Sequence, residues 1–126
     1  MSIYVFNAVV GTALPSFDPA LDTLSFDGSY TATSLVLTQS GSDTLVSYEG
    51  QGVLLSGVNR SSLAGSQFAF ADGSLFRQGT AASDSLNGSS FGDQFDITAG
   101  GGDTVTGGDG NDVVVAGAAL NAADRI

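Results

Sequence analysis

The chain has 126 residues and a net charge of −10, from 13 acidic residues against three arginines, and it contains no Cys, His, Lys or Trp. With so little positive charge to face phosphate, we expect no nucleic-acid binding. The missing residue types exclude disulfides, thiolate metal sites and catalysis that needs His, Lys or Cys.

The acidic residues are almost all aspartate, with Glu49 as the one glutamate. Asp, Gly, Ser and Thr combined with Val, Leu and Phe are typical of short strands joined by tight turns. A hydrophobic content of 42% argues against a disordered chain. Because aspartate is also a hard oxygen ligand for Ca²⁺, the composition predicts an all-β protein and favours calcium as its metal.

Residues 1–78 are predicted to form an N-terminal β-rich module. A first strand is expected over 3–10, and Pro15 and Pro19 mark the loop after it. Residues 59–65 are polar enough for a loop or one short helical turn. Regularly spaced short strands are typical of a sandwich, a barrel or a solenoid. The remaining strands are expected over 22–27, 34–38, 44–48, 53–56, 67–71 and 74–77.

Residues 79–126 contain a repeat of about nine residues. In each copy an aspartate is followed two positions later by an apolar residue, and successive aspartates are separated by nine, ten, nine and twelve residues. Glycines precede most of these aspartates and allow the backbone to curl with positive φ. The aspartates are Asp84, Asp93, Asp103, Asp112 and Asp124.

A nine-residue period divides into a turn and a short strand. If strands alternate between two walls, one coil uses two repeats, and turns two repeats apart lie on the same edge. Turn 79–84 is then predicted beside 98–103, and turn 88–93 beside 107–112. The middle residues of the strands are predicted to stack in the core, and these are Leu86, Phe95, Val105 and Val114.

The stacked carboxylates themselves indicate a cation. Neighbouring rungs lie about 4.8 Å apart, and two carboxylates at that separation repel by roughly 3.5 kcal/mol at an effective dielectric of 20. A Ca²⁺ ion between two turns would replace this repulsion by ligation, because carboxylate and carbonyl oxygens coordinate the ion. Folding would then be linked to calcium, with about 2.7 kcal/mol per site at a hundredfold excess over the dissociation constant.

The sharpest copy of the repeat, GGDGNDVVV over 107–115, matches the pattern G-G-x-G-x-D-x-U-x, in which U is a large apolar residue. Over its last third the chain therefore resembles the RTX, or haemolysin-type, calcium-binding repeat proteins. Residues 68–74 (FAFADGS) also resemble the end of a haemolysin-type calcium-binding-protein-related β module that precedes such repeats.

The resemblance implies a parallel β-roll with Ca²⁺ held between turns, and export by type I secretion. Carried over by position, Gly107, Asp109 and Gly110 supply turn carbonyls or shape, and Asp112 supplies a side-chain ligand. The earlier turns keep the aspartate but have larger residues, such as Thr80, at glycine positions. The expected metal-ligating residues are Asp84, Asp93, Asp103, Gly107, Asp109, Gly110 and Asp112.

Other readings of these residues remain open. Aspartate also favours turns without any metal, and Asp22 and Asp43, which both precede Thr-Leu, are interpreted as turn residues that open strands. Asp124 follows a longer step and is expected to start an irregular or capping turn. The spacing fits neither an EF-hand loop nor a dinucleotide-binding fingerprint.

We therefore predict an all-β fold, with an N-terminal β-rich module (1–78) that continues into a short parallel β-roll (79–126). The predicted function is that of a non-catalytic, calcium-binding structural module of a secreted bacterial RTX-type protein. Calcium would act as a folding switch, since it is scarce inside the cell and abundant outside. The N-terminus lacks the basic start of a cleaved signal peptide, and no apolar run is long enough to span a membrane.

The alternative function is a carbohydrate- or cell-surface-binding module, in which Tyr30 and Tyr48 of the N-terminal module contact polysaccharide. An enzyme is not expected, because no spacing supports paired carboxylates among Asp18, Asp27 and Glu49. The repeat array stops after one good copy, which leaves an open strand edge. Either the chain is a fragment of a longer adhesin or surface-layer protein, or open ends stack between subunits into a filament or lattice.

Overall fold

The computed structural model describes residues 1–126 and confirms the all-β fold: stacked parallel strands form a β-solenoid of about six turns. The only α-helix is α1 (Phe6–Val9), and three short 3-10 turns lie at Ala32–Ser34, Arg60–Ser62 and Gly117–Ala119. The strands are β1 (Ile3–Val5), β2 (Ala13–Leu14), β3 (Thr23–Phe26), β4 (Leu35–Ser40), β5 (Asp43–Tyr48), β6 (Gln51–Leu55), β7 (Phe68–Phe70), β8 (Phe76–Gln78), β9 (Ser85–Asn87), β10 (Gln94–Asp96), β11 (Thr104–Thr106) and β12 (Val113–Val115).

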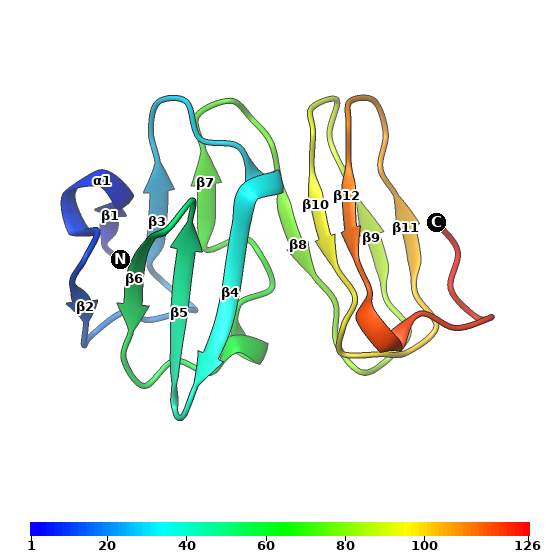
Figure 1. The fold of residues 1–126 in the computed structure, drawn as a ribbon, viewed down its shortest axis with the longest axis horizontal. Helices are drawn as coiled ribbons and strands as arrows, with labels where there is room; N and C mark the ends of the chain where they lie inside the picture. Colours follow the sequence, from blue (N-terminus) through cyan, green and yellow to red (C-terminus); the bar gives the residue numbers. More distant parts are fainter.

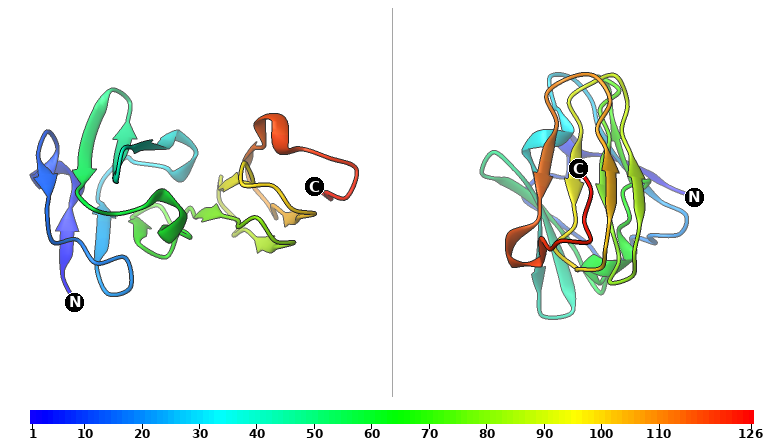
Figure 2. Two further views of the ribbon diagram at one scale, coloured as in Figure 1. Left: turned by 90° about the horizontal axis from the view of Figure 1, so that it is seen from below. Right: turned by 90° about the vertical axis from the view of Figure 1, so that its right-hand side faces the viewer.

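The strands form two walls that run along the long axis of the molecule (Figures 1 and 2). One wall contains the parallel sheet β1-β3-β7 and, farther along, the parallel pair β9-β11. The other contains the four-stranded sheet β2-β6-β5-β4, followed by the parallel sheet β8-β10-β12. Because strands of successive coils pair in parallel, the chain advances by one rung per coil from the N-terminus to the C-terminus.

A hairpin meander interrupts the coils. Strands β4, β5 and β6 pair antiparallel, although β6 also pairs parallel with β2. The β5–β6 turn has positive φ at Glu49 (47°) and Gly50 (83°), which matches the right-handed twist of the flanking strands. Alternate β5 residues, Thr44, Val46 and Tyr48, are buried, as the period of two requires.

The N-terminal module holds most of the hydrophobic core, with 17 buried apolar residues. Phe26 lies at its centre, stacked on Phe70 at a centroid distance of 4.6 Å and packed against Phe6 at 4.7 Å. The roll buries only Phe95, Ile97 and Val105, with Leu86 and Val114 packed against them. The predicted apolar stack is therefore confirmed, but it is small, so polar contacts must contribute much of the stability of the roll.

Two predicted elements differ from the structure. The expected strand over 3–10 ends at Val5, because Phe6–Val9 turns into a helical segment that buries Phe6 completely. The strand expected over 74–77 is β8, which begins at Phe76 and pairs with β10, so this wall of the roll starts before Gly79. No helix has the length and apolar character that a membrane crossing requires.

Candidate functional site: an aspartate ladder

The predicted pairing of turns two repeats apart is confirmed. Ser85 pairs with Thr104 in the β9-β11 ladder, and Gln94 pairs with Val113 in the β10-β12 ladder. Turn 79–84 therefore lies beside 98–103, and turn 88–93 beside 107–112. Each coil of the roll consumes two repeats, as the period requires.

The aspartates that precede the parallel strands are joined by hydrogen bonds from rung to rung. Asp103 Oδ1 accepts the backbone N–H of Asp84 at 2.9 Å, and Asp112 Oδ1 accepts that of Asp93 at 2.9 Å. Asp124 Oδ1 in turn accepts the N–H of Asp103 at 2.8 Å. We call this series the aspartate ladder, and its members are Asp22, Asp84, Asp93, Asp103, Asp112 and Asp124.

In the two earlier roll turns, 79–84 and 88–93, the aspartate carboxylates accept hydrogen bonds from protein donors. Asp84 Oδ2 accepts the backbone N–H of Thr80 at 2.6 Å, and the Thr80 hydroxyl lies 3.0 Å from the same oxygen. Ser89 donates to Asp93 in the same way, with its N–H at 2.6 Å and its hydroxyl at 2.8 Å. Asp93 also accepts the N–H of Leu75 at 2.7 Å. The side chains that replace glycine in these turns thus occupy the acceptor positions that a metal would use.

The turn that ends at Asp103 differs. Asp103 is 1% exposed, and its Oδ2 is buried with no hydrogen-bond partner. A buried carboxylate oxygen without a donor is unfavourable unless a proton or a cation satisfies it. Asp103 is therefore the ladder member whose environment best fits a metal ion.

In the turn 107–112 the carboxylate of Asp112 also has an oxygen without a protein donor. Asp112 is partly exposed, and the only protein donor to it is the Asp93 N–H at Oδ1. A Cβ on Gly107 would overlap Asp112 Oδ2, and one on Gly110 would lie 2.6 Å from the Phe91 carbonyl oxygen. Gly110 has a φ of +95° and its contact is with backbone, so only glycine fits there, whereas a side chain at Gly107 would displace the Asp112 carboxylate. Asp109 is exposed on the same turn.

The ladder carboxylates do not gather into a cluster. No group of three or more Asp, Glu, His or Cys side chains is placed to hold a metal ion. Instead, backbone N–H groups of the neighbouring rung supply part of the compensating positive charge. A calcium site here must therefore combine single carboxylates with turn carbonyls.

The ladder extends into the N-terminal module through Asp22. Its Oδ1 accepts the N–H of Ser2 at 2.7 Å and its Oδ2 accepts that of Asp18 at 2.8 Å. Its place before β3 is a turn position, as expected, but the hydrogen bonds are those of the roll aspartates. The shared signal is Asp-x-apolar before a strand. Asp43 carries it too, yet its Oδ1 accepts the N–H of Gly57 in the antiparallel meander.

Acid is expected to weaken the fold through the ladder ends. Backbone hydrogen bonds from Asp18 and Ser2 lower the pKa of Asp22 below its ordinary 3.8, and those from Asp103 and Asn121 lower the pKa of Asp124. The folded state then binds fewer protons than the unfolded state, so this stability is present above pH 3.8 and is lost as pH falls through the lower folded pKa values. Urea unfolding from neutral pH to about pH 2 should show this loss, and Asp22→Asn should make it shallower. An unchanged slope would contradict the role of Asp22.

The tyrosines of the alternative function meet in a shallow depression of about 320 Å³ that Asn7, Asp27 and Glu49 also line. Tyr48 is buried, and its hydroxyl accepts the N–H of Thr31 at 2.9 Å. The Tyr30 hydroxyl hydrogen-bonds Asn7. Both rings pack at 4.7 Å as part of the core edge, so they offer little free surface for stacking on a sugar.

Comparison with known proteins finds no matching family model, no matching curated protein and no matching solved structure.

Proposed function

We propose that this chain is a non-catalytic structural module of a secreted bacterial RTX-type protein, stabilised by calcium bound between stacked turns of its roll. The observation that carries the proposal is the buried, unpartnered Oδ2 of Asp103, beside a turn of the neighbouring coil. The nonapeptide at 107–115 supports it, because it is the copy closest to the RTX pattern.

The proposed sites lie at the turns that end in Asp103 and Asp112. Ca²⁺ accepts six to eight oxygens in flexible geometry, so it suits sites where carboxylates are single and backbone carbonyls make up the rest. Gly107, Asp109 and Gly110 would shape the second of these turns. At the turns of Asp84 and Asp93, an ion would compete with the hydrogen-bond donors of Thr80 and Ser89.

Calcium would supply the positive charge that the ladder lacks. Its role would be structural and not catalytic. Self-repulsion in a chain of charge −10 opposes compaction, and bound calcium would lower that charge. We propose that the roll is least stable at low intracellular calcium, which suits export, and gains stability outside the cell. The edge strands β1 and β12 at the two ends remain the proposed surfaces for stacking with another solenoid, as in a surface layer.

A calcium titration of unfolding tests the proposal. We expect the free energy of unfolding to rise by about 2.7 kcal/mol per site at a hundredfold excess over the dissociation constant. Asp103→Asn should lose at least half of this gain, because the amide removes the charge that the ion needs. The matched control is Asp27→Asn, an exposed aspartate outside the ladder.

The readout is urea unfolding followed by far-ultraviolet circular dichroism, in calcium, in magnesium and in chelator. Magnesium should stabilise far less, because it demands strict octahedral geometry and keeps its waters. Equal gains for Asp103→Asn and Asp27→Asn, or no gain for the wild type, would refute the calcium function.

A further inference from the structure

A polar cavity of about 380 Å³ lies where the N-terminal module meets the roll. Its walls come from four places: the end of β4, the chain at the 3-10 turn Arg60–Ser62, the chain around the first roll turn, and the turn between β10 and β11. Elements far apart in sequence therefore build it together. The lining residues are Gln39, Asn59, Arg60, Ser61, Gln78, Gly79, Thr80, Ala81 and Ala99.

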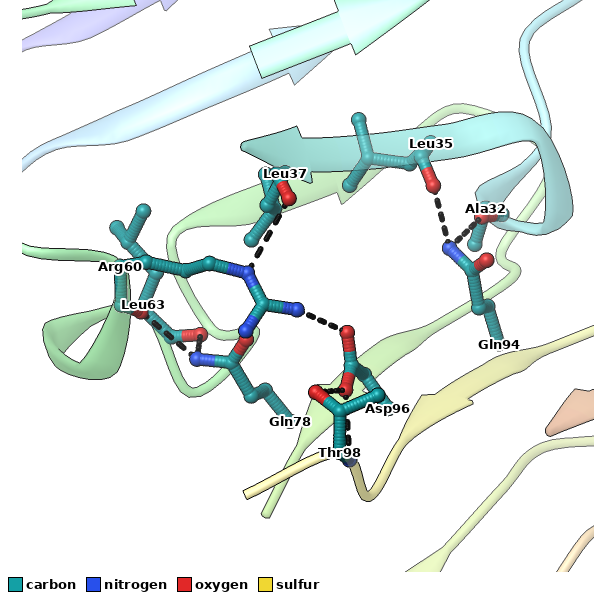
Figure 3. A network of polar contacts seen from close by, with 9 residues as sticks. All are labelled: Ala32, Leu35, Leu37, Arg60, Leu63, Gln78, Gln94, Asp96 and Thr98. Atoms are coloured by element: carbon teal, nitrogen blue, oxygen red, sulfur yellow. Dashed lines mark hydrogen bonds and ion pairs between the residues drawn. The ribbon is translucent and has the colours of Figure 1, made fainter. Parts of the chain in front are cut away.

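A hydrogen-bond network fixes one side of this cavity (Figure 3). Arg60 forms an ion pair with Asp96, and its Nε donates to the Leu37 carbonyl at 3.2 Å. Gln78 Nε2 donates to the carbonyls of Arg60 at 2.7 Å and Leu63 at 3.2 Å. These bonds orient the Gln78 amide and the Arg60 side chain before any ligand arrives.

One atom of the network has no partner. Gln78 is 8% exposed, and its Oε1 is buried without a hydrogen bond. A buried acceptor left without a donor is costly. A hydroxyl group that entered from the cavity would supply the missing donor after a small rotation of the amide.

The charges around the cavity select a neutral ligand. The Arg60 charge is matched by Asp96, and no Asp or Glu lines the walls. The net charge of −10 repels anions, and only two of the nine lining residues, both alanines, are hydrophobic. The remaining groups are amides and hydroxyls, which pair best with a ligand that both donates and accepts hydrogen bonds at several points.

We propose that this cavity binds a neutral sugar unit. Its volume is at the lower end of the range of small-molecule sites, about 300 to 1,000 Å³, which suits one ring. Because no aromatic residue lines the walls for stacking, we expect weak binding, with a dissociation constant on the order of 1 mM. The proposal does not rest on the proposed calcium sites, although Ala99 belongs to the turn 98–103 that ends at Asp103.

Nuclear magnetic resonance titration of the full chain tests the proposal. The probes are neutral monosaccharides (glucose, galactose, mannose and N-acetylglucosamine), with inorganic phosphate and choline as charged comparisons. We expect at least one neutral sugar to shift the side-chain amide signals of Gln39, Asn59 and Gln78, and neither charged probe to do so. Titrations in calcium and in chelator separate this outcome from the calcium function.

A cavity-filling variant locates the site without disturbing the network. Ala99→Trp places a large ring at an exposed lining position, whereas Ala118→Trp places one at an exposed position outside the cavity. We expect Ala99→Trp to abolish the shifts and Ala118→Trp to retain them. The proposal is overturned if no neutral sugar shifts these amides, if phosphate or choline does so instead, or if Ala99→Trp binds like the wild type.

Discussion

Asp93→Ala is expected to lower the free energy of unfolding by about 3 to 5 kcal/mol, because three partly buried donors lose their buried acceptor. The Asp93 side chain is completely buried and accepts the N–H groups of Leu75 and Ser89 together with the Ser89 hydroxyl. Alanine leaves these groups unpaired in a part of the molecule with few apolar contacts. A loss of this size is a large part of the 5 to 15 kcal/mol typical of a small domain.

Urea unfolding in calcium and in chelator measures the effect and separates two roles of the carboxylate. If Asp93 acts through hydrogen bonds, the loss is the same with and without calcium. The control Asp109→Ala changes an exposed aspartate on a neighbouring turn and should stay within about 0.5 kcal/mol of the wild type in chelator. A loss for Asp93→Ala that disappears in chelator would show that Asp93 acts only as a calcium ligand.

Gly88→Ala is expected to cost about 3 kcal/mol or more, because two rungs of the roll meet at this residue. A Cβ on Gly88 would lie 2.5 Å from Asp93 Oδ2 and 2.9 Å from Phe95 Cζ, and closer still to the Gly107 carbonyl oxygen. The contacts with backbone and with a buried ring leave no flexible atom to move. The rungs would have to separate, which weakens the bond from the Gly88 N–H to the Thr106 carbonyl.

Gly100→Ala is the matched control, because it separates steric contact from backbone strain. Gly100 has a φ of +93°, and a Cβ there would meet nothing within 4 Å. We therefore expect only the left-handed backbone penalty, about 1 to 2 kcal/mol. Thermal or urea unfolding of both variants distinguishes the two effects, and equal losses would contradict the close approach of rungs at Gly88.

Asp93→Ala and Gly88→Ala act on the same feature, the tight stacking of turns that aligns the aspartates. The ladder serves stability without any metal, since every ladder carboxylate except that of Asp84 accepts a backbone N–H of the preceding rung. The proposed calcium sites are the turns of Asp103 and Asp112, where protein donors leave carboxylate oxygens free. The proposed folding switch thus depends on two turns and not on all six ladder aspartates.

The architecture of the roll follows from the nine-residue period, which is visible in the amino-acid sequence. Nine residues give one turn and one strand, so the register of β9 with β11 and of β10 with β12 follows from counting. The apolar stack of Leu86, Phe95, Val105 and Val114 follows in the same way. The strand register and the apolar stack have local causes, because the glycines shape the turn and the alternation of polar and apolar residues orients the strand within each repeat.

The tertiary structure alone decided which oxygens are free. Asp22 and Asp43 share the same local signal, yet the first caps a residue 20 positions away in a parallel coil and the second caps Gly57 in a hairpin meander. The partners of the roll aspartates lie 19 to 21 residues away, which is the two-repeat step that counting gives. In the N-terminal module the pairings depend on the length of the first coil and on the way the meander β4–β6 is inserted, and the donors that reach each carboxylate oxygen cannot be read from a nine-residue pattern.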